Sequence, residues 1–398
     1  NEIQKTYDCG CPYYGPETGE HHPAAKNKRC QPQDNTGDYP CSNEFFHPFS
    51  FQVLDIYNNW KRGNIMVSVF FSALLLITPA QRDSLLSDIP GNAHVWREAF
   101  ETYSGDTLQS AEFLFASIDR DDRAVITTAV LNDHLLSAME SRNRWYQDLP
   151  DSVFHNYLLS YRIADEPLSS YRSALSAWLD RRVQIKPGVL EMAEEIQSVI
   201  SRNIDVVSAA DDVASPSPTQ VLPFGQASEK GIWILQAACM RSMGIPVRPV
   251  KGWFPGVDRN VYYWLDVWTP EGWHTLRDGI PSLNYVKVAV EYPSMENITY
   301  SYRPSGTLVC QPLVDFQEGW LAELMIPSGD DTVTVGGIEL DPFNPDTVEL
   351  GPGEFILRVT FFNADEILGR WSENTIIEAD SITTFDLNQA QYSITPLP

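Results

Sequence analysis

Apolar residues recur at three- and four-residue spacing through much of residues 46–215. The spacing is clear in Ser110–Ala116 and Ala124–Met139, and it continues in Val189–Val207. Such spacing places apolar side chains on one face of an α-helix. Residues 211–219 (DDVASPSPT) are dominated by loop-forming residue types. We therefore predict a mostly helical region that ends in this loop.

The pattern changes from residue 216 onward. An apolar run, Gly231–Met243, stops at Gly244-Ile245-Pro246, and a glycine followed by a proline is a typical helix end. We expect this helix to begin near Ser228-Glu229, with Ser228 as its cap. Three segments rich in Val, Tyr and Trp follow, and they read as strands: Val247–Trp253, Val261–Thr269 and Trp273–Leu276. Residues 216–305 therefore predict one buried helix against an antiparallel sheet.

Residues 306–398 carry strand signals and almost no helical period. Thr332–Ile338, Glu354–Phe362 and Ser381–Leu387 are separated by Gly, Pro, Asn and Asp. Short strands separated by such turn-forming residues are typical of a β-sandwich. The whole chain is therefore expected to be an α+β protein, with a helical N-terminal region, a helix-and-sheet core and a C-terminal sandwich.

The net charge argues against binding to nucleic acids or anionic membranes, and the hydropathy argues against a transmembrane helix. Lys and Arg number 28 and Asp and Glu 53, which gives a net charge of −25, so binding to nucleic-acid phosphates or to an anionic bilayer through a basic patch is disfavoured. The longest apolar stretch, Ile65–Ile77, is short of the roughly 20 residues that a transmembrane helix needs. We read the chain, which begins at Asn1, as a mature form, and a lipid anchor before Asn1 is left open. No metal site or cofactor is expected.

Four of the six cysteines fall within residues 1–45, a polar arm that cannot form a core by itself. Two disulfides among Cys9, Cys11, Cys30 and Cys41 would cross-link this arm. The four cysteines can pair in three ways, and the sequence does not distinguish them. A zinc site using His21 or His22 is the alternative, although the Cys9-x-Cys11 spacing is shorter than a usual zinc knuckle. Disulfides predict an exported protein, whether periplasmic, on the outer-membrane surface or secreted. Cys239 lies inside the apolar helix pattern and is expected to be a buried, inert thiol.

Several motifs in the core resemble the transglutaminase-like (papain-related) superfamily. The pattern R-x-x-G-I-P-x-R occupies Arg241–Arg248, W-x-[DE]-V-W occupies Trp264–Trp268, and G-W is Gly272-Trp273. Asp148–Arg172 resembles the segment before the core in secreted members from Bacteroidetes-type bacteria, and Leu350–Phe355 resembles their C-terminal sandwich. The resemblance implies a cysteine-protease-like core at residues 216–305.

The resemblance also implies where a catalytic triad would stand. The family's cysteine lies fifteen residues before the Gly of G-I-P, and that position is Glu229 here. Its histidine lies two residues before the Trp of W-x-[DE]-V, at Tyr262, and its aspartate falls at Arg277, with Asp278 next in sequence. A carboxylate cannot replace a thiolate in acyl transfer, and a tyrosine with a pKa near 10 is a poor base at neutral pH. Cys239 is about 15 Å along the helix from the expected position.

The same resemblance would gather aromatic side chains around the vacated cleft. The cleft-lining candidates are Trp233, Trp253, Phe254, Tyr263 and Arg277, with Tyr262 beside them. Their alternative role is ordinary core packing. We expect an exported, non-catalytic protein that binds a peptide or glycan in an aromatic-walled cleft.

Two alternatives remain open. The first is a hydrolase of glycosidase or peptidase type, in which Glu229 and either Asp278 or Asp266 act as an acid/base pair. The second is a scaffold whose C-terminal sandwich does the binding.

Overall fold

The computed structural model describes residues 77–208, 215–253, 261–276, 287–290, 296–311, 320–328, 331–338, 343–363 and 366–386. The four cysteines of the N-terminal arm lie outside these residues, as does nearly all of the apolar stretch Ile65–Ile77. The chain divides into two units, Asn1–Ser68 and Val69–Pro398, and the described residues all belong to the second. Within them, no helix is long and apolar enough to cross a bilayer.

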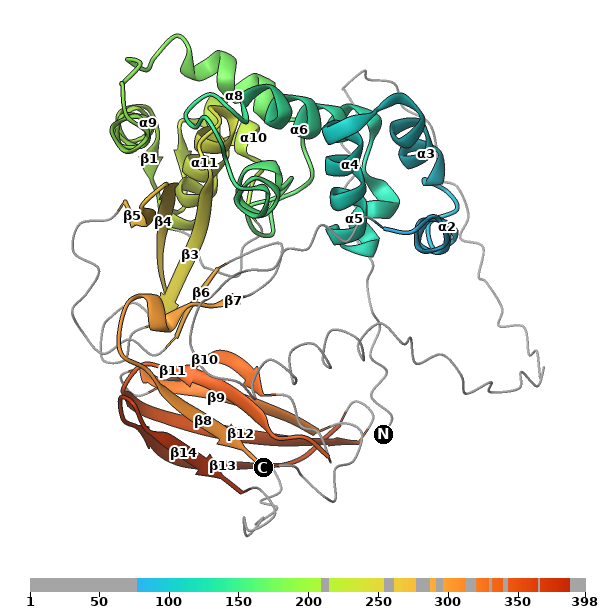
Figure 1. Cartoon of the computed structure of the whole chain (residues 1–398). Coiled ribbons are helices and arrows are strands. Elements are labelled where there is room, and N and C mark those ends of the chain that lie inside the picture. Colours follow the sequence, from blue (N-terminus) through green and yellow to red (C-terminus); the bar gives the residue numbers. More distant parts are fainter. Residues whose placement is uncertain are drawn as a thin grey trace, which may run out of the picture. The chain divides into compact units, whose positions relative to one another are not determined.

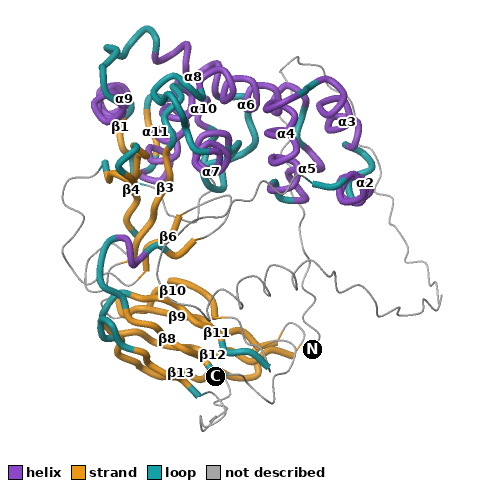
Figure 2. The backbone as a smooth tube through the Cα atoms, viewed as in Figure 1, coloured by secondary structure: helices purple, strands orange, loops and turns teal. Residues whose placement is uncertain are grey.

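Helices dominate the first half of the described chain and strands dominate the second (Figure 2). The helices before the core are α2 (Pro79–Ser87), α3 (Ala93–Thr102), α4 (Gly105–Ser117), α5 (Arg120–Val125), α6 (Thr128–Ser141), α7 (Asp151–Val153), the π-helix η1 (Phe154–Leu159), α8 (Arg172–Leu179), α9 (Val189–Asn203) and α10 (Pro218–Phe224). The mixed α and β content that the sequence predicts is confirmed.

Two predicted helical segments differ in their limits. The segment Ala124–Met139 is broken at Ile126-Thr127, because the Thr127 hydroxyl accepts the Val130 N–H at 3.3 Å and caps α6. The segment predicted at residues 189–207 ends as a helix at Asn203. The chain then extends as β1 (Asp205–Val206), which pairs in parallel with β2 (Gln226–Ala227). Backbone pairing therefore ends this helix before its apolar pattern does.

The predicted core helix is confirmed as α11 (Glu229–Ser242). The Ser228 hydroxyl accepts the Gly231 N–H at 3.1 Å and caps the helix. Gly244 follows the helix with a φ of +81°, and a Cβ there would meet the Ser141 carbonyl oxygen at 2.7 Å. The glycine of the G-I-P motif is therefore required both for its backbone conformation and for the close approach of α6.

The core sheet is antiparallel and has the order β5-β4-β3-β6-β7. Its strands are β3 (Val247–Trp253), β4 (Tyr262–Thr269), β5 (Gly272–Thr275), β6 (Lys287–Val290) and β7 (Glu296–Asn297). Helix α11 lies beside β3 and β4 (Figure 1) and buries Trp233, Ala237 and Met240 with Leu265 and Val267 of β4. The predicted pairing of one buried helix with an antiparallel sheet is present.

The C-terminal strands form two further sheets, with the orders β10-β9-β12-β13 and β11-β8-β14. Their limits are β8 (Gly306–Cys310), β9 (Trp320–Ser328), β10 (Asp331–Ile338), β11 (Asp346–Leu350), β12 (Gly353–Asn363), β13 (Glu366–Ile377) and β14 (Ile382–Phe385). Leu308 and Leu350 of one sheet share a hydrophobic cluster with Leu324 and Phe355 of the other. The predicted strands correspond to β10, β12 and β14.

Two fully buried arginines join the helical region to α11. The Arg172 guanidinium donates to the carbonyls of Leu158, Ser160 (3.1 Å) and Arg241 (3.0 Å). The Arg241 guanidinium donates to the carbonyls of Arg162 (2.7 Å) and Val247 (3.2 Å). The two side chains therefore satisfy carbonyls at the end of η1, at the end of α11 and at the start of β3, where buried oxygens need donors.

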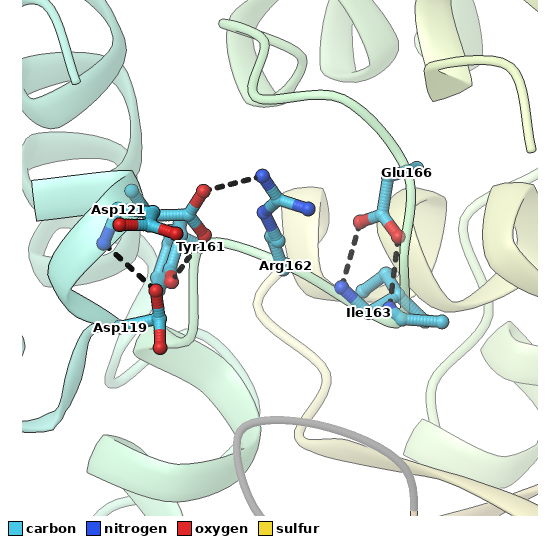
Figure 3. A network of polar contacts seen from close by, with 8 residues as sticks. Asp119, Asp121, Tyr161, Arg162, Ile163 and Glu166 are labelled. Atoms are coloured by element: carbon cyan, nitrogen blue, oxygen red, sulfur yellow. Dashed lines mark hydrogen bonds and ion pairs between the residues drawn. The ribbon is translucent and has the colours of Figure 1, made fainter. Parts of the chain in front are cut away.

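Carboxylates hold the loop that carries one of those carbonyls (Figure 3). Tyr161 and Arg162 both donate to the Asp122 carboxylate of α5, at 2.8 and 2.5 Å. The buried Glu166 carboxylate accepts the backbone N–H groups of Ile163 (2.7 Å) and Ala164 (2.8 Å). The loop therefore presents the Arg162 carbonyl to Arg241 from a fixed position.

Replacing Arg172 with methionine is expected to lower the free energy of unfolding by at least about 3 kcal/mol, because each buried carbonyl left without a donor costs roughly 1–3 kcal/mol. Urea denaturation of both proteins measures the difference. Arg97→Met is the matched control, since Arg97 is exposed, and it should change stability by less than about 0.5 kcal/mol. Equal losses in the two variants would contradict the role assigned to Arg172.

Stability is also expected to fall as the pH drops below neutrality, because His134 is buried and neutral. Its Nδ1 accepts the Arg172 Nε–H at 3.1 Å, so Nε2 carries the proton and donates to the Ser169 carbonyl at 3.0 Å. Burial, and next the Arg172 charge, lower the pKa of His134 to about 3. The unfolded chain takes up this proton near pH 6.5 and the folded chain does not, so unfolding becomes easier between these values.

Urea denaturation from about pH 7 to about pH 5 measures this effect. His134→Gln should show a smaller loss of stability over that range than the unmodified protein, whatever its stability at neutral pH. The exposed His94 provides the control, and His94→Gln should leave the pH dependence unchanged. An unchanged slope in His134→Gln would show that His134 does not carry the effect.

Candidate functional site

A hollow of about 180 Å³ lies at the N-terminal end of α11, where the resemblance would place a nucleophile. Three elements and the end of β5 line it. The lining residues are Gln197 of α9, Glu229, Ile232, Trp233 and Gln236 of α11, Tyr263, Trp264 and Leu265 of β4, and Leu276. The set holds one carboxylate, two side-chain amides, aromatic rings and aliphatic side chains, with no cysteine and no histidine.

The aromatic wall of the hollow is held in place by its own contacts. The Trp233 indole N–H donates to the Trp264 carbonyl at 2.7 Å, and the Trp233 ring is 3% exposed. The rings of Trp233 and Tyr263 are tilted against each other, with centroids 5.0 Å apart. Gln197 Nε2 donates to Gln236 Oε1 at 3.4 Å across the opposite side. The shape of the hollow is thus set by α9, α11 and β4 together.

Strand alternation separates two neighbouring tyrosines of β4. Tyr263 packs in the hydrophobic cluster that contains α11. Tyr262 packs with Val250, Trp264 and Ile298 on the opposite face of the sheet. Tyr263, one of the predicted cleft residues, therefore lines the hollow, and Tyr262 is not among the lining residues. Because nucleophile and base meet in working members of the resembling family, the sequence also predicts that Glu229 and Tyr262 lie within hydrogen-bond or near-contact range, and this stays a prediction.

Asp266 is part of a buried polar cluster on the face of β4 that also carries Trp264. Its side chain is 1% exposed and accepts hydrogen bonds from Arg248 Nε (2.9 Å), Thr275 Oγ1 (2.8 Å) and the Tyr302 hydroxyl. Trp264 Nε1 in turn donates to the Tyr302 oxygen at 3.1 Å. Asp266 is therefore occupied as the counter-charge of a buried arginine and is unsuited to act with Glu229 as a hydrolytic pair.

Aromatic rings enclose the Arg248 side chain of this cluster. The Arg248 guanidinium lies 4.6 Å from the centre of the Trp273 ring, and Tyr157 packs edge-on against Trp273 at 4.7 Å. Burial raises the pKa of Tyr157 to about 12 and also raises the pKa of Glu296, the hydrogen-bond partner of Tyr157. Tyr157 is therefore neutral at physiological pH, and the cluster is built for packing around one ion pair.

The remaining predicted site residues have different positions. Trp253 is 7% exposed, and the centre of its ring lies 5.4 Å from Lys251 Nζ. It is not among the lining residues of the hollow. Phe254, Arg277 and Asp278 lie outside the described residues. Cys239 is fully buried, and burial raises its pKa, so the prediction of a buried thiol is confirmed.

Sequence reasoning did not identify Gln197, Gln236, Ile232 or Leu276 as lining residues. Gln236 does carry a signal, because it interrupts the apolar residues of Ile232–Met240. Gln197 carries none, since a glutamine on an amphipathic helix is ordinarily on its solvated side. Within the described residues, no group of three or more His, Cys, Asp or Glu side chains could hold a metal ion.

Residues 177–277 match the family model of the transglutaminase-like superfamily. The match includes α9, α11 and strands β3 to β5, so it contains every element that lines the hollow. It supports the resemblance for this segment and begins earlier than the core limit predicted at residue 216. The chain is also similar to the crystal structure of GBS52, the minor pilin in the gram-positive pathogen Streptococcus agalactiae, with 12% sequence identity and a TM-score of 0.18 over 39% of this chain and 86% of that chain. No curated protein matches the sequence.

Replacing Asp266 with asparagine is expected to lower the free energy of unfolding by about 3–5 kcal/mol, because the buried Arg248 charge then has no counter-charge. Thermal or urea denaturation tests this. Asp83→Asn, at an exposed position, removes the same charge and should cost less than about 0.5 kcal/mol. A stability of Asp266→Asn within that same range would mean that the pair does not support the sheet.

Proposed function

We propose that this protein is a non-catalytic, transglutaminase-like binding protein, and that the hollow at the start of α11 takes one side chain or one sugar unit of a peptide or glycan. The observation that carries this proposal is the identity of the lining residues. Glu229 stands where the family's nucleophile would be, and neither a thiol nor an imidazole lines the hollow. What remains is a small recessed site with polar groups and a rigid aromatic wall, which are the features of a recognition pocket.

The positions of the two described thiols support a protein without acyl-transfer chemistry. A nucleophilic cysteine must be exposed and must have a lowered pKa, and it needs a base within hydrogen-bond distance. Cys239 is buried inside α11 and has a raised pKa, and Cys310 is buried as well, with its pKa raised to about 12. Neither of these thiols can attack a bound substrate.

The hollow also indicates the polarity of its ligand. Glu229 supplies two acceptor oxygens, Gln197 and Gln236 supply both donors and acceptors, and Ile232 and Leu276 supply aliphatic surface. No cationic side chain lines this hollow, so an anionic group is disfavoured. Neutral groups rich in hydroxyls or amides fit this set, and both peptides and glycans present them.

Export is part of the same proposal. It rests on the four cysteines of residues 1–45, which we propose to form two disulfides in an oxidising compartment. We further propose that the two C-terminal sheets form the layers of a β-sandwich around the hydrophobic cluster that they share.

Binding to a glycan array and to a peptide library, each probed with the full chain, tests the proposal. Any ligand found should bind at least about tenfold more weakly to Tyr263→Ala and to Glu229→Ala, a loss of about 1.4 kcal/mol. Tyr300→Ala and Glu194→Ala are the matched controls, because both positions are exposed and do not line the hollow. Binding that neither Tyr263→Ala nor Glu229→Ala weakens would place the ligand elsewhere.

Enzyme assays complete the test. Incubation with a glutamine-containing peptide and a fluorescent primary amine is expected to give neither amine incorporation nor peptide cleavage. Turnover that is abolished by a thiol-alkylating agent and by Cys239→Ala would contradict the proposal.

A further inference from the structure

A second, larger hollow of about 470 Å³ lies on another side of α9 and has a different chemistry. Its lining residues are Arg182 and Gln184 from the loop after α8 and Glu195, Val199, Arg202 and Asn203 from α9. Glu195, Val199 and Arg202 follow one helical stripe at spacings of four and three residues. Gln197, which lines the first hollow, is displaced from Glu195 by about 200° around the helix. The two hollows are therefore separate sites.

Cations outnumber carboxylates around the second hollow. Lys186 Nζ lies 3.6 Å from Glu195 Oε2, and Arg202 Nη2 lies 3.4 Å from Glu195 Oε1. The Gln184 backbone N–H also approaches Glu195 Oε1, at 3.5 Å. One carboxylate is thus shared at long distances among three donors, and the lining residues hold two guanidiniums, those of Arg182 and Arg202, against this one carboxylate. This excess is notable in a chain whose net charge is −25.

Arg182 is held by contacts that leave its charge uncompensated. Its Nη1 donates to the Trp178 carbonyl at 3.1 Å, and its guanidinium lies 4.7 Å from the centre of the Trp178 ring. It forms no ion pair with any residue that the structure describes. A guanidinium fixed on an aromatic face keeps N–H groups for a planar or tetrahedral oxyanion.

The C-terminal end of α9 also borders the hollow, through Arg202 and Asn203. Helix C-termini carry unpaired carbonyls with negative partial charge. Here the Asn203 side chain donates to the Val199 carbonyl at 2.7 Å, and the Ile204 N–H donates to the Ile200 carbonyl at 2.8 Å. These bonds occupy carbonyls of the preceding turn, and Arg202 places a cation beside the carbonyls that end the helix.

We propose that this second hollow binds a small organic dianion, whose negative charge is carried by two carboxylates or by one phosphate and contacts Arg182 and Arg202. A volume of about 470 Å³ falls in the range of small-molecule sites, so the hollow has room for an organic ligand and not only for a single inorganic ion. A dianion supplies one negative charge for each of the two guanidiniums that line the hollow. This site does not depend on the function proposed for the hollow at Glu229, and either can fail without the other.

Isothermal titration calorimetry on the full chain at low ionic strength tests the proposal. The probes are glutarate, which carries two carboxylates, and glucose 6-phosphate, which carries one phosphate. Glutaramide and glucose are the neutral counterparts. We expect at least one dianion to bind and neither neutral compound to do so, and added salt to weaken binding because these cations are partly exposed. The stronger probe identifies the preferred group.

Three variants locate the binding. Arg182→Gln and Arg202→Gln should each weaken the dianion at least about tenfold. Glu195→Gln should tighten it, because this change removes the repelling carboxylate that competes for Arg202, and a gain of affinity cannot arise from a damaged fold. Arg97→Gln, an exposed cation on α3, is the control and should bind as the unmodified protein does.

Two results would overturn the proposal. One is the absence of any heat of binding for either dianion. The other is binding that Arg182→Gln and Arg202→Gln leave unchanged and that Glu195→Gln does not tighten, which would show an unspecific charge effect.

Discussion

Two buried guanidiniums bonded to backbone carbonyls connect the helical region of this protein to its helix-and-sheet core. Arg172 reaches the end of η1 and the end of α11, and Arg241 reaches the Arg162 carbonyl and the first residue of β3. A buried cation is costly to desolvate, and several carbonyl acceptors at once offset that cost. Because the contacts are to backbone, they set the position of α11 itself, and all of the core packing follows from that position.

The position of α11 determines which face of β4 is covered by the helix. One face of β4 meets the helix through Tyr263, Leu265 and Val267, and the hollow at Glu229 opens along this contact. The other face carries the Arg248–Asp266 pair. Asp266 is therefore committed to a buried ion pair. The binding that we propose and this ion pair would then use opposite faces of one strand.

Local signals predicted the elements of the core well. The Ser228 cap, the Gly244 stop and the strand limits at residues 247–253 follow from residue chemistry over a few positions, and the structure agrees with each. Strands β9 and β13 were not predicted, because their sequences lack a clear alternation and both strands are specified by pairing with β12, which is distant in sequence from β9. The break before α6 was missed for a related reason, since the Thr127 cap interrupts a continuous apolar pattern.

The sequence by itself determined the kind of core, a helix followed by an antiparallel sheet, because the signals for one helix and for each strand are local. Only the tertiary structure decided which residues share a site. Gln197 joins Glu229 because α9 packs against α11, and Tyr263 faces α11, whereas Tyr262 packs on the other side, because strand direction fixes side chain alternation. Likewise, basic and acidic residues are mixed along residues 181–202 of the sequence. Only the geometry of α9 and of the loop before it brings Arg182 and Arg202 to one hollow with a single carboxylate.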